Sequence, residues 1–235
     1  MRGDDMIGII CAMELEAQAI VSDMQDKSCI RISGVDFISG TICSRDAVVA
    51  VCGVGKVFAA LCTQTMILRF SPELIINVGV GGTLTGELHC GDIAVAQSVL
   101  QHDIDTSPLG DPRGLVSGIN RINFPCDFET MTALKTIAER ELSVNCISGV
   151  IASGDRFINS SEDKIFLNQY FKSIACDMES GAVGQVCYVN SIPFCVIRSI
   201  SDEADGRSHM DYNEFAKTAA DNASRLLKIY LKESI

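Results

Sequence analysis

The stretch IGIICAMELE, residues 7 to 16, gives the first indication of how this chain folds. It begins with an apolar run, Ile7 to Ala12, that has the length and the β-branched content of a strand buried on both faces. Two acidic residues, Glu14 and Glu16, follow almost at once. Ligands in open α/β sheets bind at the carboxyl ends of the strands. The stretch therefore predicts a buried strand with acidic groups at a binding site.

Five more apolar runs of this kind follow along the chain. They span Ala47–Cys52, Leu74–Val78, Asp92–Ala96, Val150–Ser153 and Phe194–Ile200. Helical patterns lie between some of them, and the clearest one lies at the C-terminus. Strands that alternate with helices predict a three-layer α/β/α sandwich, whose central twisted sheet is mixed and largely parallel. The length of 235 residues fits one such domain, spanning 1–235.

The composition disfavours several classes of partner. The net charge of −11 argues against nucleic acid, because a protein that binds polyanions needs basic residues to replace phosphate counterions. No window approaches the ~20 apolar residues of a membrane span. The polar start MRGDD is unlike a secretory signal. The 11 cysteines include no C-x-x-C pair and lie mostly in apolar runs, which indicates buried reduced thiols in a cytoplasmic protein.

Glycines and carboxylates follow the ends of the predicted strands. The segments are Met13–Glu16, Gly53–Lys56, Gly79–Gly82, Gly154–Phe157 and Ser201–Asp205. Glycine lets a backbone approach a ligand, and carboxylates carry acid–base chemistry. The glycine segments complete neither the dinucleotide fingerprint nor the phosphate-binding P-loop, so tight turns also explain them. His102, Asp103 and Asp105 could begin a metal site, but no His or Cys cluster accompanies them. We therefore expect no metal and no organic cofactor.

Taken in order, these segments resemble the nucleoside phosphorylase/nucleosidase superfamily. The resemblance is sharpest in IGIICAMELE (7–16), GVGKV (53–57), SGDRFI (153–158), DME (177–179) and RSISDEAD (198–205). Within the superfamily, these pieces are similar to the family of 5′-methylthioadenosine/S-adenosylhomocysteine nucleosidases. The resemblance implies hydrolysis of the N-glycosidic bond of 5′-methylthioadenosine, S-adenosylhomocysteine or 5′-deoxyadenosine, which releases adenine and belongs to methionine salvage. It also implies a homodimer.

The resemblance assigns the reaction to four residues. Asp202 would protonate or hydrogen-bond N7 of adenine, and Ser201 would orient that carboxyl. Glu16 would position and deprotonate the attacking water, with Arg198 nearby. Departure of adenine leaves an oxocarbenium-like sugar, and glycoside hydrolysis commonly pairs a protonated carboxyl with an ionised one. An acid that works near neutrality needs a raised pKa in a dry pocket, which we expect for Asp202.

The resemblance also assigns residues that bind the nucleoside. Met178 and Glu179 would hold the ribose. Phe157 would stack on adenine, and the backbone of Ile158 would read the edge of the base. The pocket for the 5′ substituent would be lined by Met13, Val54 and Tyr212, together with the partner subunit's segment after His102-Asp103. Three residues depart from the family: Val80 stands for a small residue or serine, Leu109 for an aromatic residue and Tyr212 for phenylalanine.

Each of these residues alone has a simpler explanation. Glu16 could be an exposed acid in the first turn of a helix, because the helix dipole favours acids there. Asp202 could be a helix N-cap, and Glu179 could begin a solvated helix face. Met178 and Phe157 could belong to the core. The joint position of the three acidic residues at strand ends favours the site instead.

Other functions on the same fold remain open. A purine nucleoside phosphorylase would need arginines to hold phosphate, yet the first strand is followed by MELEA and the next arginine is Arg31. A futalosine-type hydrolase would use the same acid, because Asp202 can serve any purine leaving group. A non-catalytic nucleoside sensor could keep Phe157 and Glu179, but it would not need Glu16 together with Asp202.

Overall fold

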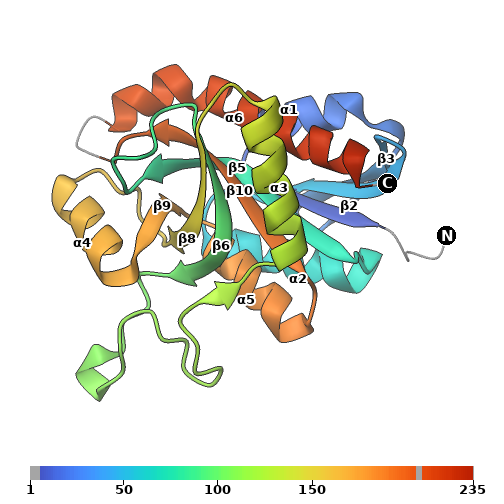
Figure 1. Cartoon of the computed structure of the whole chain (residues 1–235). Coiled ribbons are helices and arrows are strands. Elements are labelled where there is room, and N and C mark those ends of the chain that lie inside the picture. The colour runs from blue at the N-terminus through green and yellow to red at the C-terminus, as the bar shows by residue number, and fades with distance from the viewer. Residues whose placement is uncertain (1–5, 205–207, 235) are drawn as a thin grey trace.

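The computed structural model describes residues 6–204 and 208–234, which form one ten-stranded sheet covered by helices (Figure 1). The strands are β1 (Ile7–Cys11), β2 (Gln25–Ile32), β3 (Val35–Ile42), β4 (Arg45–Val51), β5 (Leu74–Thr83), β6 (Ile93–Gln101), β7 (Phe124–Pro125), β8 (Cys146–Ser153), β9 (Ser173–Asp177) and β10 (Phe194–Asp202). The helices are α1 (Glu14–Asp23), α2 (Lys56–Phe70), α3 (Phe128–Glu141), α4 (Ser161–Phe171), α5 (Ser180–Asn190) and α6 (Ser208–Glu233), with a short 3-10 helix at Ser107–Leu109.

The centre of the sheet is parallel. β4, β1, β5 and β10 are neighbours in that order, and every pairing among them is parallel. β6, β8 and β9 form a second parallel set. Antiparallel pairings join the two sets, through β6 with β10 and through β9 with β5. All six predicted strands lie in these two sets, and the predicted mixed, largely parallel sheet is confirmed.

Five strands drawn from the two sets also close into a ring. β5, β10, β6, β8 and β9 pair in a ring, because β9 returns to the end of β5, where Gly82 lies opposite Cys176. β9 was not among the predicted strands, because its five residues SIACD contain too short an apolar run to be recognised. Closure brings the ends of β5, β9 and β10 together at one place.

β2 and β3 were not predicted either, and they extend the sheet beyond β4 as an antiparallel pair. The sequence of β2, QDKSCIRI, is largely polar, and most of this strand is exposed. A strand that buries little apolar surface has no continuous apolar run by which to recognise it.

Helices cover both faces of the sheet, as the predicted sandwich requires. α1, α3 and α6 pack on one face around one apolar cluster, and α2 and α5 pack on the other face around a second cluster. α4 packs beside β8 and β9. The connection between β6 and β7 projects from the molecule as a long loop that carries the 3-10 helix (Figure 1).

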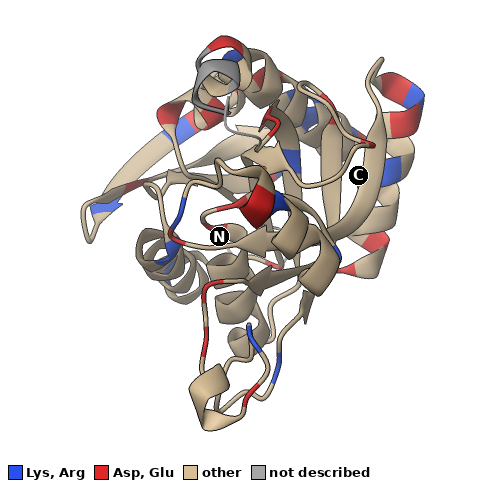
Figure 2. Cartoon of the chain, turned by 90° about the vertical axis from the view of Figure 1, so that its left-hand side faces the viewer, with Lys and Arg blue, Asp and Glu red and all other residues tan. Residues whose placement is uncertain are grey.

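Charged residues lie mainly outside these clusters. Figure 2 shows basic and acidic residues interspersed along helices and loops of one side. Among the described residues, no helix has both the length and the apolar character needed to cross a membrane.

The cysteines are less uniformly buried than expected. Seven of them are buried, whereas three are partly buried and Cys29 is exposed. The expectation of buried thiols is therefore wrong for Cys29, which lies on the exposed strand β2.

Close packing of α5 on the sheet gives a test of the fold. A Cβ atom added at Gly181 would lie 2.6 Å from the backbone oxygen of Leu100. We expect Gly181→Ala to lower the free energy of unfolding by about 1–3 kcal/mol, because the backbone must shift. Thermal unfolding measures this change. Gly86→Ala is the matched control, since nothing lies within 4 Å of its added Cβ. Equal stability of the two variants would contradict this packing.

Candidate active site

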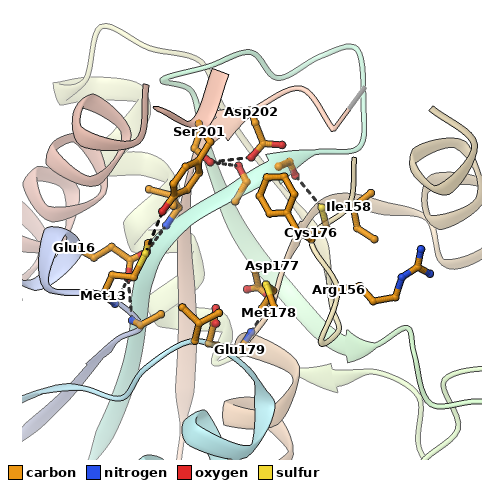
Figure 3. Close-up of a pocket in the computed structure, with 17 residues that line it drawn as sticks. Met13, Glu16, Arg156, Ile158, Cys176, Asp177, Met178, Glu179, Ser201 and Asp202 are labelled. Carbon is orange, nitrogen blue, oxygen red and sulfur yellow. Dashed lines mark hydrogen bonds between the residues drawn. The ribbon is translucent and has the colours of Figure 1, made fainter. Parts of the chain in front are cut away.

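A cavity of about 210 Å³ opens at the ends of β1, β5, β9 and β10 (Figure 3). Most of the residues that the sequence assigned to a site line it. The lining is formed by Ala12, Met13, Glu16, Val54, Val80, Gly81, Gly82, Arg156, Phe157, Ile158, Cys176, Asp177, Met178, Glu179, Ser201, Asp202 and Tyr212. Two assigned residues, Arg198 and Leu109, are not part of this lining.

Glu16 turns inward from the first turn of α1. One carboxylate oxygen accepts hydrogen bonds from the N–H groups of Ala12 (2.8 Å) and Met13 (3.0 Å), and the other accepts one from Val80 (3.0 Å). Gly79 leaves the space for it, because an added Cβ there would lie 2.5 Å from Glu16 Oε1. Glu16 is only 3% exposed, so the simpler explanation of an exposed first-turn acid is wrong. Burial raises the pKa of Glu16, while the Arg198 charge and the three N–H donors oppose this rise.

Asp202 ends β10, on the other side of the cavity from Glu16 (Figure 3). Its Oδ2 accepts a hydrogen bond from Ser201 Oγ (3.0 Å), and its Oδ1 accepts one from the N–H of Ala204 (3.1 Å). A Cβ added at Gly82 would lie 2.9 Å from Asp202 Oδ1, so the glycine gives this carboxyl its space. Because α6 begins only at Ser208, Asp202 is not the N-cap of that helix.

Glu179 stands between β9 and the start of α5. It occupies the N-cap position of α5 but makes no side-chain capping bond. Its carboxylate instead accepts the N–H of Gly55 (2.8 Å), a residue at φ 101° that glycine tolerates. Glu179 is buried, so it does not begin a solvated helix face. Burial and the neighbouring Asp177 raise the pKa of Glu179 to about 7, against the lowering effect of Arg198.

Arg198 lies in the core next to the cavity and is 1% exposed. Its Nη2 lies 2.9 Å from Asp177 Oδ2, and its Nη1 donates to the backbone oxygens of Asn77 (3.2 Å) and Ile197 (3.0 Å). Neither Asp177 nor Asn77 was among the residues predicted to form the site. Two signals could have found them: Asp177 adjoins Met178-Glu179, and Asn77 is the one polar residue in the run Leu74–Val78.

One region of the cavity lining is mainly apolar. The ring centroids of Phe157 and Tyr212 lie 6.2 Å apart in an edge-on arrangement, and Tyr212 donates its hydroxyl to Met13 Sδ (3.1 Å). Val54 and Phe157 are about half exposed, so Phe157 is not a core residue. Leu109 lies outside this region, because it sits on the projecting 3-10 helix and is 84% exposed.

The acidic residues near His102 are engaged with basic side chains. Asp103 forms an ion pair with Lys56, and Asp105 forms one with Arg113 at 3.0 Å. Within the described part of the chain, no three His, Cys, Asp or Glu side chains gather as a metal site would require.

The raised pKa of Glu179 predicts a pH-dependent stability. Its pKa of about 7 in the folded chain exceeds the ordinary value of 4.5, so the folded state binds the proton more tightly than the unfolded state. The stability that the folded chain gains by binding this proton is fully present below about pH 4.5 and is lost as the pH rises through about 7. Glu179→Gln removes the titration. We expect the variant to gain up to roughly 3 kcal/mol relative to wild type between about pH 5 and pH 8.

Denaturant unfolding at a series of pH values measures this difference. Glu162→Gln is the control, because Glu162 is an exposed acid in the first turn of α4. A difference between Glu179→Gln and wild type that stays constant with pH would contradict the burial of an ionisable Glu179.

Comparison with known proteins agrees with this geometry. Residues 6–232 match the phosphorylase superfamily. The 5′-methylthioadenosine/S-adenosylhomocysteine nucleosidase of Shewanella sediminis is 36% identical over 234 residues, covering 97% of this chain and 99% of the relative. The nucleosidase of Staphylococcus haemolyticus is 33% identical over 228 residues, with 97% and 99% covered.

Solved structures extend the likeness to the whole fold. The Neisseria meningitidis nucleosidase in complex with methylthio-immucillin-A superposes with a TM-score of 0.94 at 31% identity, covering 98% of this chain and all of that chain. The futalosine hydrolase of Helicobacter pylori superposes with a TM-score of 0.93 at 33% identity, with 98% of each chain covered. The chain therefore belongs to the phosphorylase superfamily and, within it, to the family of 5′-methylthioadenosine/S-adenosylhomocysteine nucleosidases.

Proposed function

We propose that this chain hydrolyses the N-glycosidic bond of 5′-methylthioadenosine and S-adenosylhomocysteine, and also of 5′-deoxyadenosine, and releases adenine. One observation carries the proposal: Glu16, Glu179 and Asp202 are all buried, and all three line the same cavity. A non-catalytic sensor does not need three buried carboxyls around its ligand, because burying such groups is costly.

The three carboxyls suit three separate tasks. Asp202 donates a proton or a hydrogen bond to N7 of the departing adenine, with Ser201 fixing one of its oxygens. Glu179 accepts hydrogen bonds from the ribose hydroxyls, and its negative charge stabilises the cationic sugar. Glu16 orients a water molecule for attack at C1′ and accepts its proton. Phe157 and the backbone of Ile158 bind the base. Met13, Val54, Val80 and Tyr212 surround the 5′ substituent, and Met178 packs on the ribose.

Water suits this site better than phosphate. Arg198 is engaged by Asp177 and Asn77, and Arg156 pairs with Asp163 at 2.9 Å. Figure 3 shows Arg156 at the side of the cavity opposite Glu16. A phosphate ion beside Glu16 would therefore meet a carboxylate, and the two arginines that the structure describes at or beside this cavity already have acidic partners in Asp177 and Asp163. This arrangement favours a hydrolase over a phosphorylase.

Adenine release from 5′-methylthioadenosine in phosphate-free buffer, followed by chromatography, tests the proposal. We expect rapid release by the wild type and a loss of at least ~10²-fold in Glu16→Gln, because the water then lacks its base. Glu14→Gln is the matched control, since Glu14 lies two residues away on α1 and is exposed.

Three results would contradict the proposal. Formation of ribose-1-phosphate on adding phosphate would indicate a phosphorylase. Release from futalosine alone would indicate the other hydrolase on this fold. Tight nucleoside binding without release from any of these substrates would indicate a sensor.

We further propose that residues 1–235 act as one domain and as a homodimer in the cytoplasm, in methionine salvage. An exposed apolar surface on α2 supports the dimer: Val57, Phe58, Leu61 and Leu68 all face solvent there. This surface begins three residues after Val54, which lines the cavity. A dimer that buries it would bring a second chain close to the pocket for the 5′ substituent, where Leu109 of the partner subunit could complete the lining.

Dilution tests the dimer. We expect the activity per chain to fall as the protein dissociates, because the pocket for the 5′ substituent then loses its second wall. Light scattering at the concentrations of the assay gives the oligomeric state. Full activity in a solution shown to be monomeric would refute the shared site.

A further inference from the structure

Asn77 is a buried polar residue that the proposed reaction does not use. It lies on β5 in the apolar run LIINV and is fully shielded from solvent. It does not line the cavity. A buried amide is costly unless its donors and acceptors are paired, so its partners indicate what it does.

The partners of Asn77 fix the orientation of its amide. Nδ2 donates to the backbone oxygen of Ile10 on β1 (2.9 Å). A backbone oxygen only accepts, so the nitrogen must face Ile10 and Oδ1 must point the other way. Oδ1 accepts a hydrogen bond from Nη2 of Arg198. Asn77 therefore links β1 and β5 to the guanidinium on β10.

Asn77 binds Arg198 at two of its nitrogens. The backbone oxygen of Asn77 accepts from Nη1 (3.2 Å), while Oδ1 accepts from Nη2. The same Nη2 lies 2.9 Å from Asp177 Oδ2. Without the Asn77 side chain, Nη2 would retain only its contact with Asp177, and the guanidinium would be free to turn toward that residue.

The position of this cation matters to two carboxyls of the cavity. The Arg198 charge lowers the pKa of Glu16 and of Glu179, against the effect of burial. Among the residues that the structure describes, the other titratable groups that act on these two carboxyls or on Arg198 include Asp177, Cys11, Cys52 and Tyr212. None of these four carries a positive charge, so none of them can replace the charge of Arg198 if its guanidinium moves.

We propose that Asn77 is a positioning residue, whose side chain holds the Arg198 guanidinium where its charge acts on both Glu16 and Glu179. This inference rests on the proposed hydrolysis for its catalytic consequence. The placement of the charge itself does not require turnover and can be measured separately.

The test replaces Asn77 by an apolar residue of similar size, Asn77→Leu, and titrates the glutamate carboxyls by carbon-13 NMR. Glu16→Gln and Glu179→Gln assign the signals. A cation favours the ionised carboxylate, so loosening Arg198 should raise the titration midpoints of Glu16 and Glu179 by about 0.5–1 pH unit. The acid limb of kcat/KM for adenine release should move to higher pH by the same amount.

Ser199→Ala is the matched control. Ser199 adjoins Arg198 on β10, is fully buried, and donates to the Gly91 oxygen (3.3 Å). Its loss should leave both midpoints unchanged. If Asn77→Leu does not fold, Asn77→Ser serves instead, because serine is too short to reach Arg198 and should shift the midpoints in the same direction.

A folded Asn77 variant with unchanged midpoints at Glu16 and Glu179 would overturn the inference, whatever its activity. A wild type that titrates as expected but releases no adenine would refute the proposed function and leave the placement of Arg198 by Asn77 standing.

Discussion

Arg198 places a buried positive charge beside the cavity, and this charge acts on the carboxyls of both Glu16 and Glu179. A cation removed from water is costly unless it is paired and hydrogen-bonded. Here Asp177 pairs with it, and the oxygens of Asn77 accept its N–H groups. Its charge in turn lets Glu16 and Glu179 be buried nearby, because it opposes the rise of pKa that burial causes. Arg198 therefore depends on Asp177 and Asn77, and the buried Glu16 and Glu179 depend in turn on Arg198.

The closed ring of strands is what brings these groups together. Arg198 comes from β10, Asn77 from β5 and Asp177 from β9, and neighbouring strands of the ring are hydrogen-bonded to each other. Glycines at the end of β5 complete the arrangement. Gly79 makes room for Glu16 and Gly82 for Asp202, so two carboxyls approach a backbone that any side chain would block. The glycines of the segment Gly79–Gly82 therefore leave room for two carboxyls and do not form a phosphate-binding loop.

The acidic groups of the cavity differ in their hydrogen-bond partners and in the charges beside them. Glu16 accepts three backbone N–H groups, whereas Glu179 accepts one. Burial raises the pKa of both groups, and the neighbouring Asp177 adds to the rise at Glu179, whose pKa reaches about 7. Asp202 has a hydroxyl partner in Ser201 and a backbone N–H partner in Ala204. Different environments for similar carboxyls are what a hydrolysis needs when acid, electrostatic and base roles fall to separate residues.

Apolar runs and the residues that follow them are local features, so the amino-acid sequence alone predicted the buried parallel strands and the acidic Glu16 and Asp202 that follow two of them. Glu179 follows β9, so it was assigned only through the family resemblance of the segment DME (177–179). The short run of β9 and the polar runs of the β2–β3 hairpin leave no local signal. Three features depend on the folded chain instead: the ring closes, Asn77 and Asp177 engage Arg198, and Leu109 lies away from its own chain's cavity. These are contacts between residues far apart in the sequence, and they exist only once the strands have paired.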